Sequence, residues 1–279
     1  MVYPSLLMLL ESDPGAAPRL ALACALARRF EAHLTGQSCR RHAPWKSGGF
    51  ADVLGTDALT TELREFEQAA LYREEQFERR CAQEDVAFDL VVDDGDRLAA
   101  LLRRAATADL VVAGRPDRGT DAHASRMALL ENLLLQSPRP VLVLPSDGAG
   151  AELGQRIVVA WDGSHGASRA ALDALPLLRR AAGVHLLRVE RPGEGDVVDA
   201  DQCVDRAATW LRRHGVRAEP VIVVDAGPVG DVLAARAVEF GADLLVMGAF
   251  GRPRSVERVL GGATRSVLAG APLPVLFSH

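Results

Sequence analysis

Short, continuous apolar runs alternate with longer amphipathic stretches along the whole chain. An apolar run bounded by turn residues is typical of a buried strand, whereas apolar residues recurring every three or four positions are typical of a helix. In the first half of the chain, the runs predict strands at residues 6–10, 33–37, 87–92, 110–113 and 141–144. The stretches between them predict helices at residues 16–30, 60–84, 97–106 and 126–135.

The second half of the chain shows the same order of patterns. Strands are expected at residues 157–161, 185–189, 220–224, 244–247 and 275–277. Helices are expected at residues 167–182, 201–214, 229–240 and 264–268. Strands that are apolar throughout and that alternate with helices are typical of a parallel sheet covered on both faces.

The two halves also repeat each other in sequence. The segment ADLVVAG at residues 108–114 returns as ADLLVMG 134 positions later, and near the start of each half a spacing of 151 aligns Gly15 with Gly166. A stretch of small and polar residues at 146–154 separates the copies, as expected of a linker. We therefore expect an α/β protein of two tandem doubly wound domains, residues 1–147 and 154–279, each with a five-stranded parallel sheet.

Composition and charge narrow the class of protein. Hydrophobic residues make up 48% and charged residues 25% of the 279-residue chain, which is a globular balance. The formal net charge of −5, without a run of Lys or Arg, argues against nucleic acid as a partner. The apolar run near the N-terminus is too short for a signal sequence or a membrane span. Four cysteines without a C-x-x-C spacing fit free thiols in a reducing cytoplasm.

The strongest candidate for chemistry is a glycine-rich segment after the fourth strand of the second half. Gly248 and Gly251 follow that strand, and Gly261 and Gly262 open the last helix. Glycines let a backbone approach a phosphate closely, and a helix N-terminus adds unpaired N–H donors. The alternative is that these glycines only form tight turns.

Charged side chains accompany this segment. Arg252 and Arg254 lie between the two glycine pairs and would add positive charge. Asp162 ends the first strand of the second half, which neighbours the fourth strand in a doubly wound sheet. Its carboxylate can accept hydrogen bonds from a ribose or an adenine edge. The alternative is that Asp162 only forms an Asx turn or caps the next helix.

The chain offers no catalytic residue and no metal ligand set. It contains no nucleophile elbow, no H-E-x-x-H and no Walker-type loop. Ser164 has no His partner at a fixed spacing, and His33 and His185 lie on predicted strands, where a paired residue at the edge of the core is more common than a catalytic base.

The pattern Gly-x2-Gly-x9-Gly, with ADLLVMG before it and APLPVL after it, resembles the nucleotide loop of the universal stress protein family. The segment VVAWDGS is similar to the first strand of that family, and the resemblance covers essentially the whole chain as a tandem form. It implies two adenine-nucleotide alpha hydrolase-like domains related by a pseudo-two-fold axis. It also implies a cytoplasmic stress-response protein that is not an enzyme, or at most hydrolyses ATP slowly.

The resemblance further implies ATP as the ligand, alone or with Mg²⁺. Asp162 and the backbone at Val189 would contact the base and ribose, and the glycines would contact the ribose and phosphates. The candidate nucleotide-binding residues are therefore Asp162, Val189, Gly248, Gly251, Arg252, Gly261, Gly262 and Thr264. One position departs from the family pattern, because Gly262 stands where a Ser or Thr is usual. Thr264 would have to supply the missing hydroxyl.

The first copy departs much further from the pattern. Asp117 stands at the position of the second loop glycine, Met127 at the position of the third, and Glu11 at the position of the acidic residue that ends the first strand. A carboxylate there repels a triphosphate. We therefore expect the first copy not to bind ATP in this way, and to serve as a partner for the second copy. The alternative is a different ligand, enclosed by an insertion at residues 40–60.

Three functions stay open at this stage. The leading one is nucleotide binding by the second copy, with the strands at 141–144 and 275–277 pairing inside the chain and a homodimer as a further option. The second is an interaction module without nucleotide. The third is an enzyme acting on a nucleotide-activated substrate. The insertion at residues 40–60 is either a lid or partner-binding loop, or a solvated loop whose Trp45 packs on the domain edge.

Overall fold

The computed structural model describes residues 2–41, 56–117, 122–146, 153–193, 197–249 and 261–279. Within these ranges the side chains of residues 40–41, 56–64 and 197–200 are not described. The central part of the insertion at 40–60 and most of the linker at 146–154 therefore lie outside the described residues.

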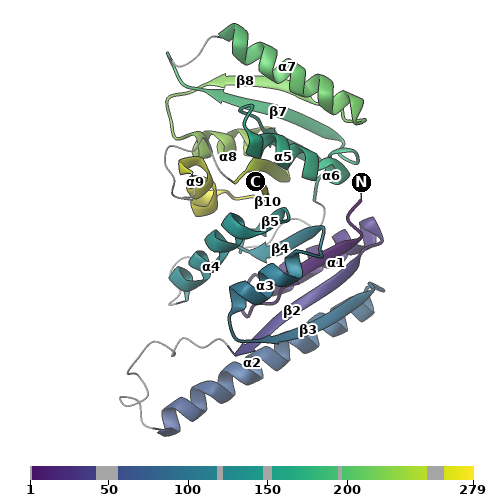
Figure 1. Cartoon of the computed structure of the whole chain (residues 1–279), viewed down its shortest axis with the longest axis vertical. Coiled ribbons are helices and arrows are strands. Elements are labelled where there is room, and N and C mark those ends of the chain that lie inside the picture. Colours follow the sequence, from purple (N-terminus) through teal and green to yellow (C-terminus); the bar gives the residue numbers. More distant parts are fainter. Residues whose placement is uncertain (1, 42–55, 118–121, 147–152, 194–196, 250–260) are drawn as a thin grey trace.

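The first copy alternates strands and helices as the sequence predicts. Its elements are β1 (Ser5–Leu9), α1 (Ala16–Phe30), β2 (His33–Arg41), α2 (Thr56–Gln83), β3 (Phe88–Asp94), α3 (Arg97–Ala105), β4 (Leu110–Gly114), α4 (His123–Gln136) and β5 (Val141–Leu144). The first strand and helix pair of the chain, β1 and α1, is drawn in purple in Figure 1.

The second copy follows the same plan. Its elements are β6 (Arg156–Ala160), α5 (His165–Asp173), α6 (Leu175–Leu178), β7 (Gly183–Glu190), α7 (Val197–Arg213), β8 (Glu219–Val224), α8 (Val229–Glu239), β9 (Leu244–Gly248), α9 (Gly262–Gly270) and β10 (Val275–Ser278).

The strands of both copies form one 10-stranded sheet with the order β3-β2-β1-β4-β5-β10-β9-β6-β7-β8. This order reads the same from either end once the copies are exchanged, so a pseudo-two-fold axis passes between β5 and β10. All pairs within a copy are parallel, and the junction is antiparallel, with Leu276 opposite Leu142 and Phe277 opposite Val141. The predicted pairing of the last strands is therefore confirmed, and each copy covers an edge of the other that would otherwise be exposed.

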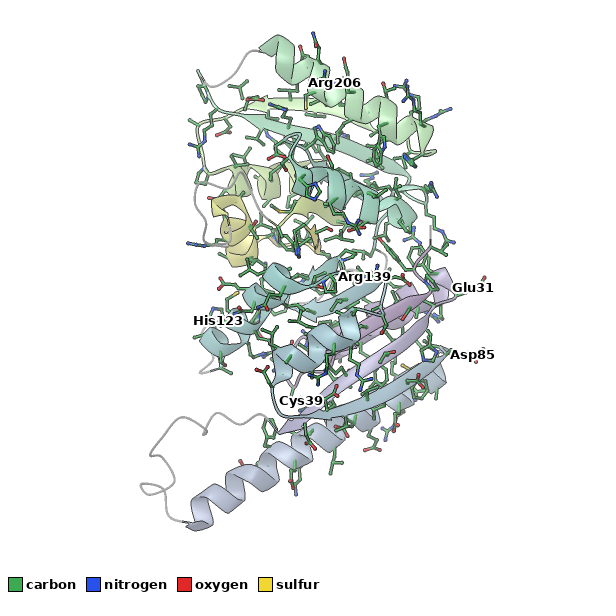
Figure 2. All side chains as sticks on the ribbon, in the orientation of Figure 1. Glu31, Cys39, Asp85, His123, Arg139 and Arg206 are labelled. Atoms are coloured by element: carbon green, nitrogen blue, oxygen red, sulfur yellow. The ribbon has the colours of Figure 1, made fainter. Side chains whose placement is uncertain are left out.

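Helices cover both faces of the sheet, and side chains fill the two layers between (Figure 2). Successive residues of a strand point to opposite faces, which divides β1 between two cores. Leu6 and Met8 pack in the core beneath α1, α2, α5 and α7, whereas Leu7 and Leu9 pack in the core beneath α3, α4, α8 and α9. The continuously apolar strands of the sequence thus reflect burial on both faces.

Contacts beyond the strand junction also join the copies. The Tyr3 hydroxyl donates to the carbonyl of Asp173, and the Arg180 guanidinium lies 4.8 Å from the centroid of the Phe30 ring. The Arg180 guanidinium also donates a hydrogen bond to the carbonyl of Arg29. The junction therefore involves α1 and α5 as well as the two central strands.

One predicted helix was wrong. The helix expected at 167–182 is two helices, α5 and α6, because Pro176 lies in the first turn of α6 and cannot supply the N–H that would continue the helix before it. This element also begins earlier than predicted, at His165, since the Ser164 hydroxyl accepts a hydrogen bond from the N–H of Ala167 and caps it at 3.2 Å.

Other helix boundaries differ from the prediction by a few residues. Helix α2 begins at Thr56 rather than at residue 60, and α4 begins at His123 rather than at 126. Among the residues that the structure describes, no helix has the length and apolar character needed to cross a membrane.

Candidate functional site

The register of the sheet brings three candidate residues to one edge. Strand β6 lies between β7 and β9, with Val159 opposite both Leu186 and Val246. Asp162 lies two residues beyond the end of β6, next to the carboxyl ends of its neighbours. Gly248 ends β9, and Val189 is the penultimate residue of β7. This edge, defined by Asp162, Val189 and Gly248, is called the second-copy edge below.

Asp162 forms a tight turn at this edge. One carboxylate oxygen accepts a hydrogen bond from the N–H of Ser164 at 2.9 Å, and the intervening Gly163 has a φ of +77°. The Asx turn that the sequence left open is therefore present. The Asp162 side chain is nevertheless exposed. Since a carboxylate has two oxygens and the turn uses one, the turn is compatible with a second hydrogen bond to a ligand.

Cys203 of α7 lies against this turn, a contact that no sequence pattern predicts. A Cβ placed on Gly163 would lie only 2.9 Å from the Cys203 sulfur. Cys203 is half-buried, whereas Cys24, Cys39 and Cys81 are buried. The reactivity of the Cys203 thiol can therefore be used to detect ligand binding at the second-copy edge.

The backbone of Val189 points to the same place. The carbonyl of Leu187 accepts a hydrogen bond from the N–H of Trp161 on the β6 side at 2.8 Å, and the carbonyl of Glu190 accepts one from Asp225 on the β8 side at 3.0 Å. The polar groups of successive strand residues alternate between the two sides. The N–H and carbonyl of Val189 thus face the β6 side, past the last residue of β6. This is an edge that an adenine ring can pair with.

Gly248 has a packing role of its own. A Cβ at this position would lie 2.8 Å from the carbonyl carbon of Gly166 and 3.0 Å from the nitrogen of Ala167. The end of β9 and the first turn of α5 are therefore in backbone contact. Gly248 allows this close approach whether or not a ligand is bound.

The N-terminus of α9 offers unpaired donors without steric hindrance. Gly261 is the N-cap residue, in an extended conformation, and it has no side chain to cap the helix. A Cβ on Gly262 would meet no atom of the described residues within 4 Å. The first N–H groups of a helix have no partner inside the helix, so this end can receive an anion.

Thr264 was predicted to offer its hydroxyl to a phosphate, but in the structure this hydroxyl makes a hydrogen bond inside the protein. Its side chain is buried, and its hydroxyl donates to the carbonyl of Ala249 at 2.7 Å, which ties α9 to the end of β9. A hydroxyl has one proton to donate, so a contact with phosphate would require this bond to be exchanged. Gly251 and Arg252, the remaining candidates, lie outside the described residues.

The corresponding edge of the first copy carries a cluster of buried charges. Asp13 binds the guanidinium of Arg19 at 2.6 Å and that of Arg126 at 2.5 Å. Glu11 binds Arg126 at 3.1 Å and Arg97 at 3.2 Å. We call these five residues the first-copy charge cluster.

The cluster replaces a backbone contact of the second copy. A Cβ on Gly114, the counterpart of Gly248, would lie 2.2 Å from the Arg19 guanidinium, which is only 1% exposed. Arg19 aligns with Ala170 of the second copy. Where the second copy packs backbone on backbone, the first therefore inserts a guanidinium group.

The cluster also determines the protonation of its members. Burial alone raises the pKa of Asp13, but hydrogen bonds and charge from Arg19 and Arg126 outweigh it and hold the pKa below its usual value. Burial lowers the pKa of Arg126, but Glu11 and Asp13 outweigh it and raise the pKa above its usual value. The members of the cluster are thus paired with one another. An alignment of the two copies could have pointed to this cluster, since Asp13 and Arg19 stand where the second copy has Ser164 and Ala170.

His33 and His185 lie at the opposite end of their strands from the second-copy edge and the first-copy charge cluster. His33 is the first residue of β2, and its Nε2 lies 3.0 Å from the Asp89 carboxylate. Nδ1 of His185, near the start of β7, lies 3.5 Å from the Glu219 carboxylate. Both are at the amino ends of their strands and next to an acidic residue, as expected of paired residues at the edge of the core.

The fold and the edge together define a class of protein: a tandem pair of doubly wound domains with one polar, open carboxyl edge and one filled edge. The sequence model of the universal stress protein family matches residues 6–145 and again residues 154–279. The chain therefore belongs to the universal stress protein family and contains two of its domains in tandem.

Solved structures agree with this fold. A universal stress protein from Archaeoglobus fulgidus is similar with a TM-score of 0.73 at 18% identity, over 98% of this chain and 95% of that one. A functionally unknown protein, PA1789 from Pseudomonas aeruginosa, is similar with a TM-score of 0.60 at 17% identity, over 99% and 92%. At these identities the likeness concerns the fold. No curated protein matches the chain.

Proposed function

We propose that the second copy binds an adenine nucleotide, ATP, at the second-copy edge, and that the chain is a cytoplasmic stress-response protein. The nucleotide acts as a ligand that stabilises one conformation, and not as the substrate of a catalysed reaction. The observation that carries this proposal is the convergence of an exposed carboxylate, an outward-facing backbone edge and a helix N-terminus at one place.

Each group suits one part of the ligand. The free oxygen of the Asp162 carboxylate accepts a hydrogen bond from a ribose hydroxyl, since hydroxyl groups donate to carboxylates. The N–H and carbonyl of Val189 pair with the edge of the base. The N–H groups at Gly262 and the residues after it receive phosphate oxygens, where the helix dipole favours negative charge. Mg²⁺, when bound with ATP, would neutralise part of the phosphate charge.

The first copy serves as the structural partner in this proposal. Its edge is closed by the first-copy charge cluster, and its last strand completes the central sheet. The strand edge through which the copies pair is used within the chain, so a homodimer would need another surface. Support for a cytoplasmic location comes from the four cysteines, all of which are free thiols.

Calorimetric titration with ATP and Mg²⁺ tests the proposal. We expect one equivalent of ATP to bind the parent chain. A Gly262→Asp variant places a carboxylate at the phosphate position, and it should weaken binding about tenfold or more because like charges repel. Space is open at Gly262, and an acidic residue suits a helix N-terminus, so this variant should fold.

The matched control is Gly270→Asp at the other end of α9. A Cβ there also meets nothing within 4 Å, so the substitution adds the same charge to the same helix far from the phosphate position. It should leave ATP affinity unchanged. Failure of the parent chain to bind ATP would overturn the proposal, and equal loss in both variants would show that the effect is not local.

Thiol labelling gives an independent measurement. In the native protein a maleimide should react with Cys203 and spare the three buried cysteines. Bound ATP should slow this reaction, because Cys203 lies against the turn that holds Asp162. An unchanged rate at a saturating ATP concentration would place the nucleotide elsewhere.

A second candidate function is an interaction module of the same fold that binds no nucleotide. Two observations favour it: the Thr264 hydroxyl is used inside the protein, and Gly262 supplies no hydroxyl. The same titration separates the two functions. Absence of ATP binding, together with a partner that is retained after Gly248 and Gly262 are substituted, would support the interaction module.

A further inference from the structure

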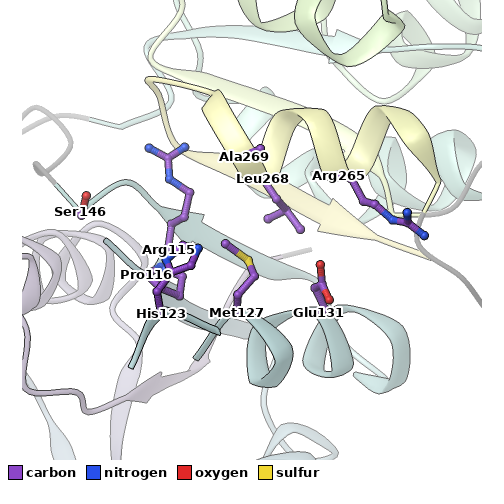
Figure 3. A pocket seen from close by; sticks show the side chains of 9 residues that line it. All are labelled: Arg115, Pro116, His123, Met127, Glu131, Ser146, Arg265, Leu268 and Ala269. Atoms are coloured by element: carbon purple, nitrogen blue, oxygen red, sulfur yellow. The ribbon is translucent and has the colours of Figure 1, made fainter. Parts of the chain in front are cut away.

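A cavity of about 530 Å³ lies between the two copies, bounded by α4 on one side and α9 on the other (Figure 3). Cavities of a few hundred to about a thousand Å³ are the usual size of small-molecule sites. Neither Asp162, Val189 nor Gly248 lines this cavity. It is therefore separate from the second-copy edge, and the inference below does not rest on the proposed function.

The cavity exists because the two copies have diverged in side-chain size. The repeat spacing of 134 aligns α4 with α9. The second copy has Gly261, the N-cap residue of α9, and Ala269 where α4 has Met127 and Leu135. The smaller side chains of α9 leave room opposite α4. Figure 3 shows Met127 of α4 and Leu268 of α9 pointing toward each other across the space, so the centre of the cavity is apolar.

The charges around the cavity have diverged as well. Glu131 of α4 and Arg265 of α9 are counterparts in the repeat, yet they carry opposite charges. The counterpart of Arg115 is Ala249, which is uncharged. Two identical copies would place like groups on both sides of the axis. Among the described residues that line the cavity there are instead two arginines and one carboxylate, an excess of positive charge.

Two polar side chains at one end, Arg115 and His123, are held in position. Arg115 donates a hydrogen bond to the carbonyl of Ala271 in the second copy, which keeps its guanidinium at the junction. His123 Nδ1 lies 2.8 Å from the carbonyl of Asp117, and because a carbonyl only accepts, this nitrogen carries the proton. Figure 3 shows Arg115 and His123 together on one side of Met127, and Glu131 on the other.

We propose that this interdomain cavity binds a small organic anion with an apolar body. The carboxylate, sulfonate or phosphate group of such a ligand lies at the Arg115 guanidinium, and its hydrophobic part lies between Met127 and Leu268. A guanidinium donates paired hydrogen bonds to such anions, and the apolar centre excludes ligands that are charged throughout. Because residues of both copies line the cavity, the ligand also stabilises their pairing.

The test uses 1-anilinonaphthalene-8-sulfonate, which combines one sulfonate with an aromatic body. Titrated into the full chain, this dye should bind saturably with one site per chain, as measured by fluorescence and calorimetry. Ala269→Trp fills the cavity from an exposed helix position and should weaken binding about tenfold or more. Arg265→Glu reverses one charge and should weaken it severalfold.

Matched controls come from elements away from the cavity. Ala235→Trp adds the same side chain to an exposed position of α8, and Arg212→Glu makes the same charge change on α7. Both should bind the dye like the parent, and melting curves should show all four variants folded. The proposal is overturned if binding is not saturable, if Ala269→Trp binds like the parent, or if ATP displaces the dye, since the last result would place the dye at the second-copy edge.

Discussion

The two copies share a fold but treat the carboxyl ends of their first and fourth strands in opposite ways. In the second copy, the turn at Asp162 is open, and α5 packs directly on β9 because Gly248 has no side chain. In the first copy, Arg19 fills the corresponding position and is paired with Asp13. A duplicated chain can thus retain one polar edge for a ligand and close the other with its own charges.

The first copy also shows how charged side chains can be accommodated inside a domain. The carboxylates of the first copy would repel one another and any phosphate if they stood alone. Three arginines, Arg19, Arg97 and Arg126, neutralise them inside the fold. The fold therefore tolerates each buried charge only while its partners are present. Removing one partner tests the comparison between the two copies.

The largest effect should follow from breaking that set. Arg19→Met leaves Asp13 buried with less compensation, and it should lower the free energy of unfolding by about 3–5 kcal/mol. Urea denaturation measures this loss. The control is Arg169→Met in α5, which removes an ion pair with Asp173. The Arg169 side chain is 39% exposed, so the loss should be less than about 1 kcal/mol. Equal losses in the two variants would contradict the idea that the cluster is a buried unit.

A smaller loss of stability should follow at the second-copy edge. Gly248→Ala pushes a methyl group against the backbone of Gly166, and it should lower the free energy of unfolding by about 1–3 kcal/mol through overpacking. Gly262→Ala is the matched control, because the position is open and the change should lie within about 0.5 kcal/mol. If Gly248→Ala were neutral in urea denaturation, the backbone contact would not require glycine.

A gain of function should follow from restoring the usual family residue. Gly262→Ser adds a hydroxyl at the N-terminus of α9 in open space, and one more hydrogen bond to a phosphate should strengthen ATP binding about tenfold. Calorimetry measures the change, and Gly270→Ser at the far end of the helix should not alter the affinity. Weaker binding by Gly262→Ser would mean that the phosphate lies elsewhere.

The smallest effect should come from pH. The pKa of Asp13 is lowered below its ordinary value of 3.8 in the folded protein. The stability it contributes is therefore present above the unfolded pKa, and it is lost as the pH falls through the lower, folded pKa. Urea midpoints should decline below about pH 4, and the decline should be shallower in Arg126→Met, where one partner is missing. If the urea midpoints of parent and variant fell equally at low pH, the loss of stability would come from other carboxylates.

Most of the fold could be predicted from the sequence because the strands are buried on both faces. Runs such as Leu110–Gly114 are apolar throughout, and helix Ala16–Phe30 was predicted with the bounds it has in the structure. The exception was the helix broken at Pro176, where a local property outweighed the apolar pattern. The pairing of Val141–Leu144 with β10 was expected from the resemblance to the universal stress protein family, and the structure confirms it.

The site was predictable only where backbone geometry decides it. Register brings Asp162, Val189 and Gly248 to one edge. The doubly wound strand order was enough to expect Asp162 beside Gly248, whereas Val189 was taken from the family resemblance. The role of Thr264 could not be predicted, because which acceptor its hydroxyl meets depends on how α9 lies on β9. The contact of Cys203 with Gly163 likewise joins residues from two elements whose distance no local pattern fixes.

The sequence by itself determined that the chain holds two copies of one α/β domain, because burial and turn formation are local properties written into the order of apolar and polar residues. Only the tertiary structure decided what the differences between the copies mean. In the sequence Arg19 is only one basic residue of a helix. In the structure its guanidinium lies against Gly114 and is paired with Asp13. Met127 and Ala269 likewise form a cavity only because the antiparallel junction brings α4 and α9 face to face.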